Sequence, residues 1–245
     1  MKIKARIETN HDLNPMLKLE TYRVEKSVGG LIDSYAIFEL VKPALSQPCF
    51  ALLEKGKSQI HYVSEVEAPN QRLRYIPYER VPWSLATTLE DYGNYQDLWN
   101  EVQECVYQHL DLPKPNDHKI LTAWIFSTYL LEKWETVPFL QFIGAFETGK
   151  SHALELLAQL CFRGWLGVGL TEANLYRPVE KWHPVLFIDE SESAIDRATL
   201  IALLNSSYRR GYYVPRQEKQ PDGTFETVFY DLFGFKAIAG TKDLP

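Results

Sequence analysis

The first third of the chain has the hydrophobic spacing of short β-strands. In residues 2–8 apolar and polar side chains alternate, so the apolar ones share one face of a strand. Further short apolar or β-branched runs are separated by turn residues such as Gly29-Gly30 and Ala68-Pro69-Asn70. These runs occupy residues 34–41, 49–53, 60–63 and 73–78. The pattern predicts a small, mostly β N-terminal domain over residues 1–92.

Helical spacing begins near residue 94. Asn94 is a suitable N-cap for a helix with Asp97 at its third position, because its side chain can accept a hydrogen bond from the backbone there. A second helix is predicted to begin at Asn116 or Asp117 and to run through Trp134. This helix is apolar almost all round, which indicates that it is buried. The two helices form a linker region that leads into the second domain.

The remaining sequence alternates short apolar runs with amphipathic stretches, which is typical of a parallel α/β sheet flanked by helices. The predicted strands are residues 139–143, 165–169, 185–188 and 235–239. The predicted helices cover residues 151–162, residues 171–176 and a stretch from Ser191 or Ser193 to Tyr208. A hairpin is also predicted, because residues 212–214 and 225–229 flank the turn signal Gln220-Pro221-Asp222-Gly223. The second domain, residues 93–245, is therefore predicted to be α/β.

The sequence between the first of these strands and the first of these helices carries a candidate phosphate-binding loop. Residues 144–151 match the pattern G-x-x-x-x-G-K-[ST]. The two glycines permit backbone conformations in which successive N–H groups turn inward around a β-phosphate. The N-terminus of the following helix favours anions as well. The predicted nucleotide-binding residues are Gly144, Ala145, Phe146, Glu147, Thr148, Gly149, Lys150, Ser151 and His152.

Four side chains have predicted chemical roles at this site. Lys150 is predicted to contact the β- and γ-phosphates, and Ser151 to contribute its hydroxyl to Mg²⁺. A second motif supplies carboxylates, since the strand predicted at residues 185–188 ends in Asp189-Glu190. Asp189 is predicted to hold the metal through water, and Glu190 to orient or deprotonate the water that attacks the γ-phosphate. The two motifs in this order predict a nucleoside-triphosphate site with ATP and Mg²⁺ as cofactors.

Composition and charge restrict the partners and the compartment. The net charge is −6, so the surface as a whole is not a nucleic-acid footprint, and DNA binding needs a local basic segment. The three cysteines are widely spaced in apolar surroundings, which favours reduced thiols in a cytoplasmic protein. The most apolar segment, residues 121–131, is shorter than the ~20 residues that a membrane-spanning helix needs. We therefore expect a cytoplasmic protein without a membrane partner.

The order of the motifs resembles that of a known group of ATPases. An Asp-Glu step at the end of one strand is typical of AAA+ ATPases. The segments GAFETGKS, VLFIDESE, LLNSSYRRG and FKAIAG follow one another in this chain. This order resembles the P-loop ATPase cores of phage, plasmid and mobile-element primase–helicases, which are relatives of the superfamily-3-like and AAA+ helicases. The resemblance covers about residues 120–245 and implies a ring-forming, DNA-stimulated ATPase of the helicase type.

The resemblance implies roles for residues outside the two motifs. Thr241, at the end of the strand predicted beside the loop strand, is at the place of the AAA+ sensor 1, which contacts the γ-phosphate or the attacking water. Arg209 and Arg210, at a helix end, would reach the nucleotide of a neighbouring subunit. The predicted hairpin would contact single-stranded DNA through Arg216 and Lys219, since cations take phosphates and aromatic rings stack on bases. The residues assigned to this contact are Arg216, Lys219, Lys236, Tyr212, Tyr213 and Phe225.

Ordinary structural roles are open for the same residues. Thr241 is equally explained as a turn residue, the two arginines as a solvent-exposed helix end, and the hairpin as a solvated one. The function also has alternatives. An AAA+ protein that remodels or loads protein partners needs no DNA contact, and the acidic charge favours it. A nucleotide-binding scaffold with little hydrolysis is the third hypothesis.

The C-terminal part departs from the family pattern. An AAA+ core continues beyond sensor 1 with another strand and a helical lid, whereas this sequence ends soon after Thr241. We expect residues 93–245 to be an incomplete ATPase domain without the lid. We also expect the sheet to lack a fifth strand, so that the outer edge of the loop strand is bare or covered by the N-terminal helices.

Overall fold

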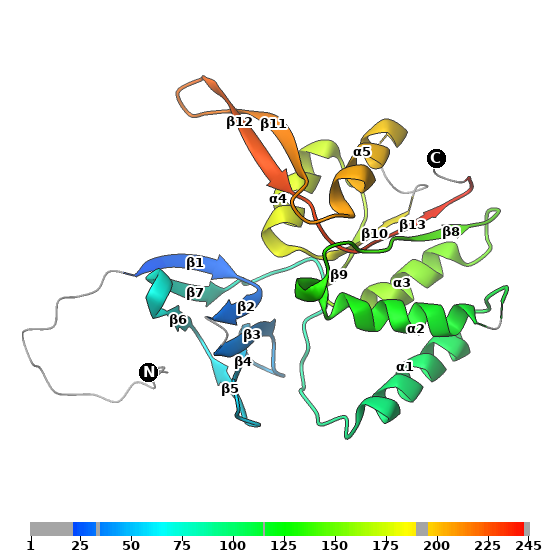
Figure 1. The fold of residues 1–245 in the computed structure, drawn as a ribbon, viewed down its shortest axis with the longest axis horizontal. Helices are drawn as coiled ribbons and strands as arrows, with labels where there is room; N and C mark the ends of the chain where they lie inside the picture. The colour runs from blue at the N-terminus through cyan, green and yellow to red at the C-terminus, as the bar shows by residue number, and fades with distance from the viewer. Residues whose placement is uncertain (1–21, 33–34, 115, 190–195, 243–245) are drawn as a thin grey trace, which may run out of the picture. The chain divides into compact units, whose positions relative to one another are not determined.

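The structure is a computed structural model of the 245-residue chain. It describes residues 22–32, 35–114, 116–189 and 196–242. The chain divides into two compact units, Met1–Val81 with Leu85–Glu90, and Pro82–Ser84 with Asp91–Pro245. The first is called the N-terminal unit and the second the C-terminal unit, and each contains its own β-sheets (Figure 1).

The N-terminal unit consists of two small sheets, which confirms the predicted β character of this region. One sheet is antiparallel, with the strand order β2 (Gly29–Ile32), β3 (Ala36–Val41), β4 (Cys49–Glu54) and β5 (Ile60–Val63). The other has β7 (Leu73–Pro77) at its centre, flanked by the parallel strand β1 (Arg23–Ser27) and the antiparallel strand β6 (Val66–Ala68). A 3-10 turn, η1 (Pro69–Gln71), connects β6 to β7.

The inner faces of these two sheets share one aromatic core. Phe38 on β3 and Phe50 on β4 are almost fully buried, and their rings meet edge to face with centroids 5.0 Å apart. Tyr75 on β7 packs against Phe38 at 5.3 Å. The sequence does not predict β1, β2 and β6, because the glycines and charged residues in them are typical of turns and surfaces. The strand predicted at residues 2–8 lies outside the described residues.

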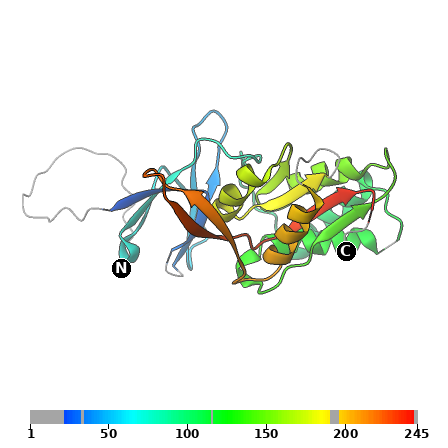
Figure 2. The same ribbon diagram turned by 90° about the horizontal axis from the view of Figure 1, so that it is seen from above.

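The C-terminal unit is built around a parallel sheet, as predicted. Its strand order is β8 (Leu140–Ile143), β13 (Lys236–Gly240), β10 (Val185–Asp189) and β9 (Gly164–Gly167). Figure 2 shows these strands side by side, with α5 (Arg197–Ser207) lying across them. Within the described residues the sheet has four strands and β8 forms one of its edges, as expected for a sheet without a fifth strand.

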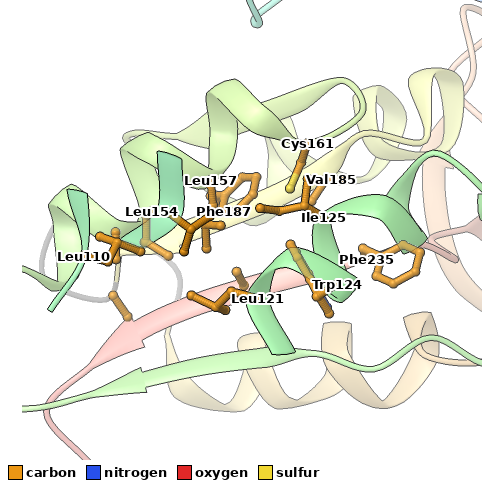
Figure 3. Packing of buried hydrophobic residues seen from close by; sticks show 14 of the residues in the cluster. Leu110, Leu121, Trp124, Ile125, Leu154, Leu157, Cys161, Val185, Phe187 and Phe235 are labelled. Carbon is orange, nitrogen blue, oxygen red and sulfur yellow. The ribbon is translucent and has the colours of Figure 1, made fainter. Parts of the chain in front are cut away.

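Helices cover both faces of this sheet. On one face lie α1 (Tyr95–His109), α2 (Asp117–Thr128) and α3 (Lys150–Leu160). Figure 3 shows their core, in which Trp124 of α2 and Leu157 of α3 pack near Phe187 of β10. On the opposite face α4 (Glu172–Trp182) and α5 cover Leu186 and Ile188. Strand β10 is therefore buried on both sides, which explains its continuous apolar sequence.

The two leading helices begin as predicted, but one ends earlier. The Asn94 side chain caps α1 by accepting a hydrogen bond from the Asp97 backbone N–H at 3.0 Å. Helix α2 ends at Thr128 instead of Trp134, and a 3-10 turn, η2 (Leu131–Lys133), follows it. The buried side of α2 is also narrower than predicted. Three apolar residues of this region are more than half exposed, namely Ile120, Tyr129 and Leu130.

Helix α4 is longer than predicted. It continues through Pro178, whereas the sequence predicts that it ends at Arg177-Pro178. A proline removes one helical hydrogen bond. Leu175 and Val179 on either side of Pro178 are almost completely buried, so packing holds this helix together across the missing bond.

Helix α5 has a different N-cap from the one predicted. It begins at Arg197, and the Asp196 carboxylate accepts hydrogen bonds from the backbone N–H groups of Ala198 and Thr199 at 2.9 and 3.0 Å. Asp196 is thus the cap of this helix, and the predicted caps, Ser191 and Ser193, lie outside the described residues.

The predicted hairpin is present. Strands β11 (Tyr213–Lys219) and β12 (Phe225–Asp231) pair in antiparallel register, and the hairpin projects from the body of the C-terminal unit (Figures 1 and 2). Across the described ranges, none of the helices combines the length and the apolar character needed to cross a bilayer.

Candidate nucleotide-binding site

The glycine loop lies at the carboxyl edge of the parallel sheet. Strand β8 ends at Ile143, and α3 begins at Lys150, so the loop connects a strand to a helix as its motif requires. Gly149 precedes this helix with φ of 81°, a left-handed conformation that glycine adopts without strain. The backbone N–H of Gly144 donates to the carbonyl of Gly240 at 3.3 Å, which joins the loop to the end of β13.

Side chains of the loop close it on itself. The Thr148 hydroxyl donates to the Ala145 carbonyl at 2.9 Å, and the Lys150 ammonium donates to the same carbonyl at 2.5 Å. A Cβ on Gly144 would lie 2.7 Å from the Thr148 hydroxyl oxygen, so a larger residue here would displace the Thr148 side chain from its present position. Glu147 has φ of 62° although it is not glycine, which places local backbone strain inside the loop.

The two motifs meet at one hydrogen bond. Ser151, at the start of α3, donates its hydroxyl proton to a carboxylate oxygen of Asp189, at the end of β10, over 2.5 Å. Asp189 is only 6% exposed, whereas Ser151 is open to solvent. A hydroxyl and a carboxylate held together are oxygen ligands of the kind that Mg²⁺ prefers. No cluster of three or more His, Cys, Asp and Glu side chains suited to a metal occurs in the described part of the chain.

The other predicted residues of the site have different placements. Thr241 is exposed and directly follows Gly240, the register partner of Ile143, so it lies beside the start of the loop. Phe146 and His152 are exposed as well, with 78% of Phe146 accessible. Glu190 lies outside the described residues.

The two candidate trans-acting arginines are not equivalent. The Arg210 guanidinium donates to the carbonyls of Leu131 and Trp134 at 3.2 and 3.3 Å and lies 4.5 Å from the centre of the Phe233 ring. The Arg210 guanidinium is therefore engaged by contacts within its own chain, at the end of η2. Arg209 is exposed, and its guanidinium lies 5.7 Å from the centre of the Tyr212 ring.

The cations assigned to the hairpin lie in three different environments. Lys219 is exposed on the outward face of β11. Arg216 faces helix α4, where its guanidinium lies 4.5 Å from the ring centre of Tyr176 and donates to the hydroxyl of that residue. Lys236 is fully buried, and its ammonium donates to the carbonyls of Leu232 and Gly234 at 2.8 and 2.9 Å. The assignment of Lys236 to a DNA-contacting surface is therefore wrong.

A polar network that the sequence does not predict attaches the hairpin to α4. Arg177 of α4 donates two hydrogen bonds to the Glu218 carboxylate of β11, at 3.1 and 2.5 Å, and the Tyr230 hydroxyl of β12 donates to the same carboxylate. These bonds lower the pKa of Glu218 below its usual value, with the Arg177 bond as the main cause. The partners are 41 residues apart in the chain, so no local pattern could indicate their contact.

Comparisons with known proteins do not identify a family. No protein-family description matches the chain, and no curated protein matches it. One similar solved structure is described as "The A form apo structure of NrS-1 C terminal region-CTR(305-718)", with a TM-score of 0.37 and 11% sequence identity. The alignment covers 84% of this chain, and the chain spans about half, 54%, of the length of that one. Similarity this low carries no conclusion about activity.

Proposed function

We propose that the C-terminal unit is a Mg²⁺-dependent ATPase. The observation that carries the proposal is the 2.5 Å hydrogen bond between Ser151 and Asp189, because it joins the end of the glycine-loop motif to the carboxylate motif. The loop also lies between a parallel strand and the N-terminus of an eleven-residue helix, where backbone N–H groups favour phosphate. The residues at this edge therefore suit a nucleoside triphosphate with its metal.

Each residue has a distinct part in the proposed reaction. Ser151 and Asp189 would hold Mg²⁺, which neutralises charge on the β- and γ-phosphates when it is bound. Lys150 would exchange the Ala145 carbonyl for phosphate oxygens. Glu190 would orient or deprotonate the attacking water, and Thr241 would bind the γ-phosphate or that water. The glycine-loop residues 144–152 would surround the phosphates.

The hairpin supports single-stranded DNA as the partner of this ATPase. Tyr213, Phe225 and Phe229 are 56%, 68% and 62% exposed, and the strand register places them on the same face as Lys219. Exposed aromatic rings beside a cation are the chemistry that binds single-stranded nucleic acid without sequence preference. This arrangement favours a DNA-stimulated motor of the helicase or primase–helicase type over a protein remodeller. Arg209, the exposed member of the arginine pair, is then the candidate for reaching a neighbouring subunit in a ring.

Steady-state ATP hydrolysis by the full chain, with and without single-stranded DNA, tests this function. We expect DNA to stimulate hydrolysis, and Glu190→Gln to reduce it by about 10²-fold or more while ATP still binds, because the base is lost. Lys150→Ala is expected to abolish ATP binding. Glu155→Gln, a charge-matched change at an exposed position of α3, serves as the control and should leave the rate unchanged.

The alternatives give different results in the same assay. Hydrolysis that is indifferent to DNA would favour a protein remodeller or loader. Binding of ATP with negligible hydrolysis in the unmodified chain would favour a nucleotide-binding scaffold. Failure to bind any nucleoside triphosphate in the presence of Mg²⁺ would contradict the proposal as a whole.

A further inference from the structure

The glycine loop contains a carboxylate whose charge opposes that of its proposed ligand. Glu147 lies between the two motif glycines, Gly144 and Gly149, and its side chain is exposed to solvent. The other charged side chain of the loop is Lys150, and Asp189 is the carboxylate to which the loop is joined. Two carboxylates and one ammonium give this part of the site a net negative charge before any ligand binds.

The loop lysine contacts oxygen atoms of its own loop instead of the Glu147 carboxylate. The Lys150 ammonium donates to the Ala145 carbonyl at 2.5 Å and to the Thr148 hydroxyl at 3.4 Å. Across the described ranges, none of the ion pairs includes Glu147. The charge of this carboxylate is therefore reduced only by water and by dissolved salt.

The backbone holds Glu147 in a conformation that favours glycine. Phe146 and Glu147 form a turn within the loop, and Glu147 has φ of 62°. This left-handed region disfavours residues with a Cβ, and such a residue stays there only where its surroundings impose the conformation. The loop thus carries a carboxylate at a point where the backbone alone would favour glycine.

The chain itself keeps this carboxylate close to the place of the phosphates. Glu147 is two residues from Ala145, so their Cα atoms are at most about 7 Å apart. The Ala145 carbonyl is the group that the Lys150 ammonium contacts, and Lys150 would bind the β- and γ-phosphates. Salt screens charges over about 10 Å at 0.1 M. The Glu147 charge therefore acts on any anion bound by this lysine.

We propose that Glu147 makes the loop selective for the metal complex of a nucleoside triphosphate over the metal-free anion. This selectivity rests on the proposed nucleotide site and gives that site a further specificity-determining residue. Coulomb repulsion is proportional to the ligand charge, and Mg²⁺ reduces the charge of ATP from about −4 to about −2. Glu147 therefore opposes the binding of metal-free ATP about twice as strongly, in free energy, as that of the Mg²⁺ complex.

Binding of a non-hydrolysable β,γ-imido analogue of ATP to the full chain tests this selectivity. Isothermal titration calorimetry measures the affinity with Mg²⁺ and with EDTA at the same low ionic strength. Glu147→Gln removes the charge and keeps the length of the side chain. We expect this change to raise the affinity about threefold with Mg²⁺ and about tenfold without it, because the repulsion doubles with the ligand charge.

Three further variants separate the charge from other effects. Glu147→Asp keeps the charge and should retain the affinities of the unmodified chain. Glu147→Gly removes the charge and also fits the left-handed backbone, so gains like those of Glu147→Gln would assign the effect to charge. Glu101→Gln removes a carboxylate at an exposed position of α1 and should change neither affinity. Circular dichroism with thermal unfolding checks that each variant folds.

The outcomes separate the role of Glu147 from the nucleotide site itself. No gain in Glu147→Gln, an equal gain with and without Mg²⁺, or a gain confined to Glu147→Gly would overturn the role of Glu147 and leave the site in place. Failure of the unmodified chain and of every variant to bind the analogue with Mg²⁺ would contradict the proposed function, and the selectivity with it.

Discussion

Lys236 is the residue whose environment differs most from its sequence expectation. A lysine two positions after Gly234 at the start of an apolar strand resembles a surface cation, yet the side chain is fully buried and its ammonium is bound by two carbonyls. Burial lowers the pKa of Lys236 to about 7, although Asp231 partly offsets the effect. The folded protein therefore loses this proton near neutral pH, whereas the unfolded chain keeps it up to about pH 10.4.

This difference predicts the pH dependence of stability. Between about pH 7 and pH 10 the unfolded chain binds more protons at Lys236 than the folded chain, so the free energy of unfolding should rise with pH. In Lys236→Met this contribution disappears. Urea unfolding measures the free energy of unfolding at pH 7 and at pH 9.5. Between these two pH values it should rise by up to about 3 kcal/mol more in the unmodified chain than in Lys236→Met, at 1.36 kcal/mol per pKa unit. Equal pH dependence in both proteins would contradict a buried, proton-releasing lysine.

Strand alternation explains why the hairpin cations separate. Arg216 and Lys219 are three positions apart on β11, and side chains an odd number of positions apart lie on opposite faces of a strand. The sequence therefore contains the signal that these two residues do not share one surface. It does not indicate which face is covered, because Tyr176 belongs to α4, 40 residues away in the chain.

At the scale of elements, the hairpin has an inner face attached to α4 and an outer face open to solvent. If the outer face binds single-stranded DNA, Lys219→Ala should lower the salt dependence of binding by about 0.7 in the log–log slope, as for one phosphate contact. Phe225→Ala should weaken binding by about 1–3 kcal/mol through the loss of one stacked base. Fluorescence anisotropy with a labelled oligonucleotide at several salt concentrations measures both effects.

Arg216→Ala is the matched control for the hairpin. It removes a cation from the same strand, but its partner is the Tyr176 ring on the inner face. We expect a lower melting temperature and little change in the salt dependence of DNA binding. A larger loss of DNA binding in Arg216→Ala than in Lys219→Ala would show that the outer face is not the contact surface.

The ends of elements were less predictable than the elements themselves. Hydrophobic spacing indicates all four strands of the parallel sheet and the helices between them, because each must bury an apolar side. It places the end of α4 wrongly at Pro178, where tertiary burial of Leu175 and Val179 outweighs the lost hydrogen bond. It misses β2 as well, since Gly29-Gly30 is typical of a turn and only pairing with β3 makes it a strand.

At the scale of the whole molecule, two compact units are joined through an exposed stretch. Limited chymotrypsin digestion should cut first after Leu89, Tyr92 or Tyr95, because these side chains are exposed and residues 88–94 lack backbone pairing in regular structure. Mass spectrometry of the first fragments identifies the site. First cuts between β2 and β7 or between α2 and β13 would contradict this expectation.

The order of the strands within the parallel sheet is also a property of the folded chain as a whole. The sequence predicts which runs are strands, but β13 lies between β8 and β10 in space although it follows both in the chain.

The contact between Ser151 and Asp189 has a thermodynamic consequence for ligand binding. Their side chains come from a helix and a strand that are 38 positions apart, and the hydrogen bond already restricts both. The rotational entropy of these two side chains is therefore lost when the protein folds, and little of it remains to be lost when a ligand arrives. A cation at this position would replace one shared proton instead of ordering two free side chains. Its affinity would then depend on the integrity of the sheet and α3 as much as on the ligand atoms themselves.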